Sequence, residues 1–161
     1  MTRTEATGYD GLASRLVPEA ELREFLLDCF GIAEHELFVS HADRVDEALE
    51  GVPKDVTFPA FCTYEEAGGH FAMRFDVGIE GRLADRVGRR EFIARFAARF
   101  GMYVLYGDDD PVWLWSVILP DGSRLLAELD DEDGTPMLYA VTAPVPGLTD
   151  IRVDESLWRI R

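Results

Sequence analysis

Cys62, Glu65, Glu66 and His70 are the side chains whose types and spacing come closest to a catalytic set. A thiol beside an imidazole can act as a nucleophile with its base, and two adjacent carboxylates can shift each other's pKa values. However, Glu65 and Glu66 precede Ala67-Gly68-Gly69, which is the usual composition of a hairpin loop. Two interpretations remain open, a small enzyme that uses this cluster or an ordinary turn between two strands.

The sequence lacks the short motifs that mark common catalytic and cofactor sites. It has no glycine-rich phosphate loop, no dinucleotide fingerprint and no serine nucleophile elbow. The spacing of His35 and His41 fits neither a helix face nor a zinc finger. We therefore expect no cofactor and no metal ion, and the sequence favours a protein that is not an enzyme.

Acidic residues offer a different chemistry. The chain has 31 Asp and Glu residues against 16 Lys and Arg residues, which gives a net charge of −15. The excess lies in residues 1–54 and 102–161, whereas residues 55–101 carry seven acids and seven bases. Nucleic acid is disfavoured as a partner because it requires clustered Lys and Arg, and an anionic membrane surface is disfavoured by the same sign of charge.

Two acidic runs stand out, Asp108-Asp109-Asp110 and Asp130-Asp131-Glu132-Asp133. The second run does not fit a calcium-binding loop, which needs acids at alternate positions and glycine at the sixth. Each run is either a solvated loop or part of a surface for a positively charged partner.

The length and composition are those of one globular domain. The chain has 161 residues, of which 47% are apolar, and its two cysteines, Cys29 and Cys62, do not form a disulfide framework. We expect both to be buried reduced thiols. No signal peptide or membrane-spanning run is found, so we expect a cytoplasmic protein. A single Lys, 15 Arg and no Asn or Gln suit a GC-rich bacterial genome.

Two helices are marked by apolar periodicity and by their end residues. In the first, Pro18 suits the first helical position, an apolar stripe runs from Leu22 to Cys29, and Gly31 is a natural stop. The second, at 88–100, has an apolar face that includes Phe92 and Phe96. A shorter helix is predicted at 42–50, with Ser40 as its N-cap.

Strands are predicted at 36–40, 56–64, 70–78, 102–106, 112–119, 124–130 and 137–143. Short links between consecutive strands favour antiparallel pairing. We therefore predict an α+β fold in which an antiparallel sheet, made of a C-terminal four-strand meander and an earlier hairpin, carries two to three helices mainly on one face. Residues 1–16 are predicted as a flexible lead-in and 17–161 as a single domain.

The meander has a consequence for the acidic runs. Successive turns of a meander alternate ends, so the loops at 107–111 and 130–136 should lie at the same end, about 10 Å apart. We call the two runs together the acidic rim. Beside it, strand 112–119 is apolar on both faces, with Trp113 and Trp115 on the face that the helices do not explain. Either the C-terminal segment, through Leu157, Trp158 and Ile160, or another protein chain covers the second face.

These features favour an acidic protein-binding module, of the inhibitor or immunity type, that neutralises a basic partner such as a nuclease-like toxin. Opposite charge accelerates the encounter and aromatic anchors supply affinity. The candidate binding residues are the acidic rim with Trp113 and Trp115. Three alternatives remain, which are an enzyme built on the Cys62 cluster, a homodimer that closes the tryptophan face, and acidity that serves only solubility.

Overall fold

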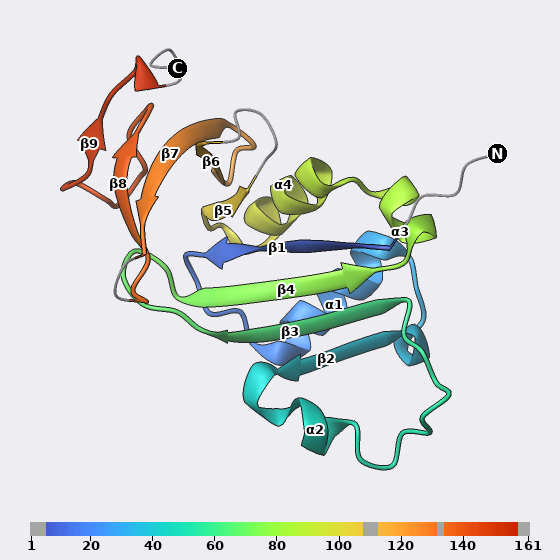
Figure 1. Ribbon diagram of the computed structural model, residues 1–161. Helices are drawn as coiled ribbons and strands as arrows, with labels where there is room; N and C mark the ends of the chain where they lie inside the picture. The colour runs from blue at the N-terminus through green and yellow to red at the C-terminus, as the bar shows by residue number, and fades with distance from the viewer. Residues whose placement is uncertain (1–5, 108–112, 132–133, 158–161) are drawn as a thin grey trace.

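A computed structural model describes residues 6–107, 113–131 and 134–157 of the chain. In these residues, nine strands form one mixed sheet in the order β2-β3-β4-β1-β5-β6-β7-β8-β9, and four α-helices accompany it (Figure 1). The fold is therefore α+β.

The first half of the sheet contains four strands, which come from residues 7–79. They are β1 (Thr7–Ala13), β2 (Leu37–His41), β3 (Ala60–Glu66) and β4 (Met73–Ile79). The last two form the expected hairpin, and β1 pairs antiparallel with β4 along all seven of its residues.

The second half is the predicted meander. Its strands are β5 (Val104–Gly107), β6 (Trp115–Ile118), β7 (Arg124–Asp130) and β8 (Met137–Val141), each antiparallel to the next. A two-residue strand, β9 (Arg152–Val153), adds to the outer edge of β8. The strands of this half run steeply across the direction of β1–β4, so the sheet bends between β1 and β5 (Figure 1).

Three parts of the predicted fold are corrected. The sheet is mixed and not purely antiparallel, because β2 runs parallel to β3 and β8 runs parallel to β9. Residues 42–59 return the chain to the start of β3, and this crossover makes the β2–β3 pair parallel. Residues 7–13, predicted as part of a lead-in, form the strand that joins the two halves.

The third correction concerns the segment after β2. The predicted helix at 42–50 is a 3-10 turn, Ala42–Arg44, followed by one turn of helix, α2 (Val45–Ala48). Its cap is His41, whose side chain accepts the Asp43 N–H, while the Ser40 hydroxyl donates to the His41 carbonyl.

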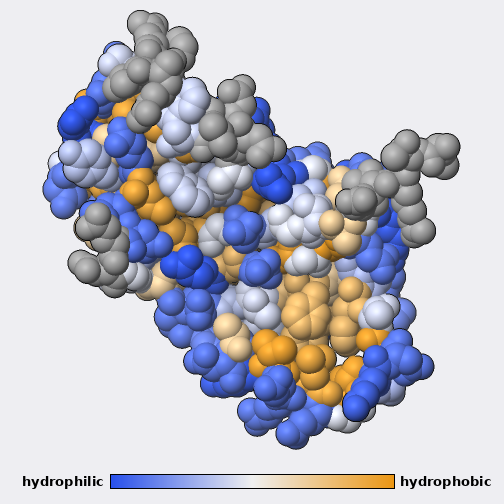
Figure 2. Space-filling view, viewed as in Figure 1, coloured by the Kyte–Doolittle hydropathy of each residue, from blue (hydrophilic) through white to orange (hydrophobic). Residues whose placement is uncertain are grey.

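The two long helices lie on one face of the first half of the sheet. They are α1 (Glu19–Phe30) and α4 (Arg89–Phe100), preceded by the short α3 (Gly81–Arg86). As predicted, both long helices end at glycines with left-handed backbone, Gly31 at φ 62° and Gly101 at φ 58°. Figure 2, in the same view as Figure 1, shows the opposite face of β1–β4, which these helices leave uncovered.

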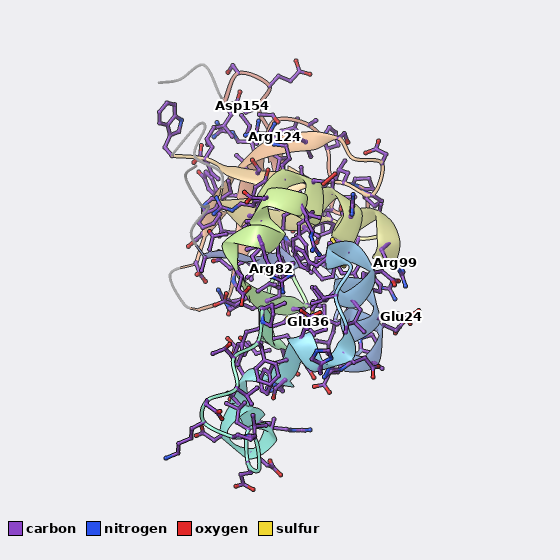
Figure 3. All side chains as sticks on the ribbon, turned by 90° about the vertical axis from the view of Figure 1, so that its right-hand side faces the viewer. Glu24, Glu36, Arg82, Arg99, Arg124 and Asp154 are labelled. Atoms are coloured by element: carbon purple, nitrogen blue, oxygen red, sulfur yellow. The ribbon has the colours of Figure 1, made fainter. Side chains whose placement is uncertain are left out.

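Arginines on the helix side neutralise nearby carboxylates. Arg82 lies 3.0 Å from Glu36 and 3.1 Å from Glu80, and Arg99 lies 3.7 Å from Glu24 (Figure 3). Acidic residues of the first third are thus paired with bases of the neutral middle third.

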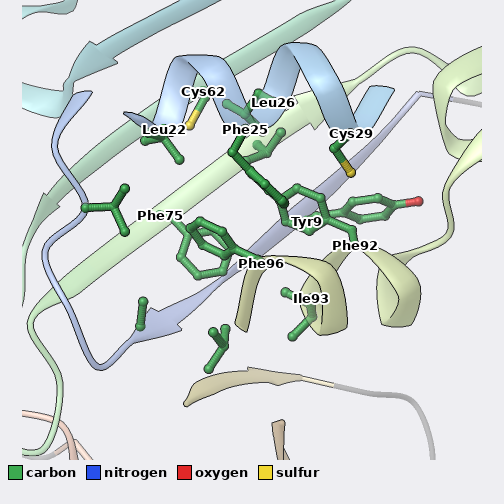
Figure 4. Packing of buried hydrophobic residues seen from close by; sticks show 14 of the residues in the cluster. Tyr9, Leu22, Phe25, Leu26, Cys29, Cys62, Phe75, Phe92, Ile93 and Phe96 are labelled. Carbon is green, nitrogen blue, oxygen red and sulfur yellow. The ribbon is translucent and has the colours of Figure 1, made fainter. Parts of the chain in front are cut away.

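The main core lies between these helices and the sheet. Phe25 of α1 stacks on Phe96 of α4 at 5.0 Å between ring centroids, and Phe75 of β4 meets Phe96 edge-on at 5.1 Å (Figure 4). Tyr9 of β1 is 3% exposed in this layer and donates its hydroxyl to the Val87 carbonyl. This packing fixes which face of β1 and β4 is buried, so their intervening residues point to the other side.

In the meander half, loops cover the face that continues from the uncovered face of β1–β4. Val117 and Leu125 are buried there under Phe71, from the loop between β3 and β4, and Val145, from the loop between β8 and β9. On the opposite face, Leu157 is 2% exposed and packs with Leu114 and Ala140. Leu157 thus covers the Leu114 face of strand 112–119 and not, as one alternative predicted, the tryptophan face. On the tryptophan face the chain's own loops cover Val117, while Trp113 and Trp115 stay exposed.

Candidate interaction surface

The surface of interest is the face of β1–β4 opposite α1 and α4, which we call the open face. Strand register sets its side chains in rows that cross the four strands. One row consists of two aromatic residues and two glycines, and the next row is polar and includes two carboxylates. From β2 to β1 these rows are Phe38, Phe61, Gly78 and Gly8, and then Ser40, Thr63, Asp76 and Asp10.

Asp10 and Asp76 lie directly opposite each other on neighbouring strands. In the described part of the chain, neither carboxylate has a hydrogen-bond or ion-pair partner. Partial burial, together with the negative charge of Asp10, raises the pKa of Asp76 above its ordinary value. Like charges in direct cross-strand positions destabilise a sheet, so this pair is a cost that a bound cation would remove.

Arg74, two residues before Asp76 on β4, is the nearest base along that strand. Its Nε lies 3.8 Å from the carboxylate of Glu65, its cross-strand neighbour on β3. Glu65 therefore offsets the charge of Arg74, and the open face keeps an excess of negative charge around Asp10 and Asp76.

A cavity of about 260 Å³ opens where the sheet bends. Only Leu12 and Ala13 of β1 pair with β5, and beyond them the two strands separate. The Asp10–Asp76 pair and Leu12 line one side of the cavity, while Trp115, Leu129 and Asp131 of the meander line the other. The cavity thus combines three carboxylates and the Arg74 side chain with apolar and aromatic walls, and this net negative lining suits a cationic side chain with an aliphatic stem.

The structure places only part of the acidic rim. Asp131 lines the cavity and Asp130 ends β7, and the meander puts the C-terminal ends of β5 and β7 at one end of the sheet, as predicted. Asp108, Asp109, Asp110, Glu132 and Asp133 lie outside the described residues. Trp115 lines the cavity and is 39% exposed, and Trp113 is 44% exposed.

The four side chains of the proposed catalytic cluster do not converge. Cys62 is fully buried on the helix side of β3, where burial raises the pKa of its thiol far above the ordinary value. His70 accepts the Leu138 N–H through Nδ1, and its Nε2 faces Asp150 at 4.0 Å. Glu66 lies 2.8 Å from His41, and Glu65 pairs with Arg74. Each of the four groups is thus engaged or buried at a separate place.

The sequence predicts no bound metal ion, and the described residues offer no assembled ligand set for one. No group of three or more His, Cys, Asp or Glu side chains there is arranged to hold a metal ion. In the same residues, the helices are all too short or too polar to cross a membrane.

Sequence reasoning missed Asp10 and Asp76. Asp10 lay in the predicted lead-in, and Asp76 occupied a polar position of an alternating strand that any solvated face would produce. The local signal was weak, because two glycines in seven residues and the apolar Leu12 break the polar–apolar alternation that would mark a strand around Tyr9 and Asp10.

Comparisons with protein-family models, with curated proteins and with solved structures found no match for this chain.

Proposed function

We propose that this chain is an acidic protein-binding module, of the inhibitor or immunity type, which neutralises a basic partner through the open face and the adjoining acidic rim. The observation that carries the proposal is the cavity at the bend, where Asp10, Asp76 and Asp131 meet Trp115. A basic side chain of the partner would enter this cavity and neutralise the aspartate pair. A nuclease-like toxin, whose substrate cleft must be cationic to hold phosphates, is the kind of partner that fits.

The size of the surface supports this proposal. Three strands of seven residues and β2 of five, about 4.8 Å apart and at about 3.4 Å per residue, cover about 420 Å². That is more than half of the roughly 800 Å² that each partner contributes to a standard protein interface. The cavity walls and the acidic rim would supply the remainder.

Charge favours a basic protein over a second copy of the chain. Two copies that each carry a net charge of −15 repel each other, whereas a cationic protein is attracted and its encounter is accelerated. On the helix side, arginines pair with nearby carboxylates. On the open face, the carboxylates of Asp10 and Asp76 lie beside each other without a paired base among the described residues.

Site-specific photocrosslinking in the native host tests the proposal. A photoreactive amino acid at Thr63, on the open face, should capture one basic protein, and the same group at Ala98, exposed on α4, should not. The captured protein, once purified, should bind the chain with an affinity that falls as salt rises, and it should lose its own activity in the complex. Equal crosslinking from both positions, or a captured protein that is acidic, would contradict the proposal.

A further inference from the structure

Gly8 of β1 and Gly78 of β4 face each other on the open face, and the fold requires neither to be glycine. Neither has a positive φ angle. A Cβ atom would lie 3.8 Å from the Asp76 carboxylate at Gly8 and 3.8 Å from the Phe61 carbonyl at Gly78, both ordinary contacts. Glycine inside a strand destabilises the fold relative to alanine.

Two other glycines show what a structural requirement looks like. At Gly11 a Cβ would lie 2.3 Å from the Leu105 carbonyl oxygen, which the β1–β5 contact does not allow. Gly69 has φ 67°, and its Cβ would lie 2.1 Å from the Pro136 carbonyl oxygen. The Gly8–Gly78 pair has no such reason in the described structure.

An aromatic wall stands beside this pair of glycines. Phe61 stacks on Phe38 at 4.4 Å between ring centroids, and Phe38 contacts Phe58 at 5.5 Å. The Phe61 ring leans toward β2 and lies more than 4 Å from a Cβ at Gly78, so it does not fill the space above the glycines. The result is an open groove of about 500 Å³, with Phe58, Pro59 and Phe61 along one side. Apolar surface is visible over this part of the molecule, around β2 and the loop to β3 (Figure 2).

We propose that the Gly8–Gly78 floor receives a large aromatic side chain of the basic partner, next to the basic side chain that enters the cavity. Glycine in a strand interior often marks the place where another molecule approaches the backbone closely, and buried aromatic anchors dominate the affinity of many interfaces. This inference rests on the proposed function, because the same partner supplies both side chains.

The geometry links the two subsites. Gly8 and Asp10 are two residues apart on β1, as are Gly78 and Asp76 on β4, a distance of about 7 Å. The partner therefore presents an aromatic side chain and an Arg or Lys side chain about 7 Å apart on one surface.

Two small probes separate the subsites in solution. N-acetyl-tryptophan amide represents the aromatic anchor and arginine amide represents the basic side chain, and NMR spectra of the ¹⁵N-labelled protein report where each binds. In the wild-type protein, the first probe should shift the amide signals of Gly8 and Gly78 saturably, and the second should shift those of Asp10 and Asp76.

Two double variants serve as reciprocal controls. Gly8→Val with Gly78→Val fills the floor with residues of high β propensity, so thermal unfolding should show a fold at least as stable as the wild type. This variant should bind the tryptophan probe at least tenfold more weakly than the wild type does, and its affinity for arginine amide should be unchanged. Asp10→Asn with Asp76→Asn should produce the opposite pattern.

Three results would overturn the inference. The tryptophan probe could bind the valine variant as well as it binds the wild type, or it could shift no signal at the floor. Sedimentation could instead show a wild-type dimer that the valine variant dissociates, which would make the groove a self-interface. If only the tryptophan probe binds, the aromatic subsite stands and the proposed function loses its cationic subsite, so the two failures are distinguishable.

Discussion

One face of the sheet is covered by loops over the meander and is left open over β1–β4. Over the meander, Val117 and Leu125 lie beneath Phe71 and Val145, and this half of the face is closed by the chain's own loops. Over β1–β4, the continuation of the same face carries an aspartate pair, a glycine pair and half-buried aromatic rings. The chain's own loops therefore cover one half of this face and leave the other half open, and this contrast supports the proposal that the open half binds a partner.

The largest effect is expected from a substitution in the covered half of this face. Phe71 is 5% exposed and meets Tyr103 edge-on at 5.7 Å, so Phe71→Ala should lower the free energy of unfolding by about 3–5 kcal/mol. Phe61→Ala, on the open half, should cost about 1–2 kcal/mol because that ring is only half buried. Urea unfolding of both variants measures the difference, and equal losses would show that the two halves are alike.

Loss of a hydrogen bond between the β3–β4 loop and β8 should give the next largest effect. His70 accepts the Leu138 N–H at 2.9 Å, and its own carbonyl accepts the Tyr103 hydroxyl. His70→Ala leaves the Leu138 N–H without this acceptor, so we expect a loss of about 1–3 kcal/mol. Hydrogen exchange at Leu138 should accelerate as well. His35→Ala is the control, since His35 is exposed. An unchanged exchange rate at Leu138 in His70→Ala would show that this hydrogen bond does not stabilise the loop.

A smaller effect of opposite sign is expected on the open half. The pKa of Asp76 is raised, so its contribution to stability is fully present below the ordinary carboxyl value of 3.8 and is lost as pH rises through the folded-state pKa. At neutral pH, Asp76→Asn should therefore increase the free energy of unfolding by a few tenths of a kcal/mol, after screening by solvent. Below pH 3.8 the gain should disappear.

Asp154, beside β9, is the matched control for that substitution. Hydrogen bonds from Ser156 and then from Arg152 lower the pKa of Asp154, so its stabilising contribution is present at neutral pH and is lost as pH falls through the folded-state pKa. Asp154→Asn should therefore destabilise the protein at neutral pH. Chemical unfolding of the two asparagine variants across pH measures both signs, and equal signs would mean that the open half is not electrostatically distinct.

The sequence could predict the elements whose information is local. Helices α1 and α4 follow from apolar periodicity and from the terminal glycines Gly31 and Gly101, and the meander follows from short links between alternating strands. Strand β1 was missed because Gly8 and Gly11 give it a weak local preference, so that pairing with β4 and β5 makes it a strand. The parallel β2–β3 pair depends on a crossover that no local pattern shows.

The candidate site divides in the same way. Trp115 and Asp131 were predicted to bind a partner and do line the cavity, because both belong to the meander. Asp10 and Asp76 come from strands that are distant in sequence, and only the register of β1 against β4 brings them together. A side chain's partner across a sheet is a long-range property, so composition and spacing could not reveal this pair.

The most direct test of the central claim is a binding titration of the crosslinked partner against the wild type and against Asp10→Asn with Asp76→Asn, each at low and at high ionic strength. We predict that the double variant binds at least tenfold more weakly, a loss of about 1.4 kcal/mol or more, and that its affinity depends less on salt. The same affinity and the same salt dependence for both proteins would contradict the assignment of the open face as the binding surface.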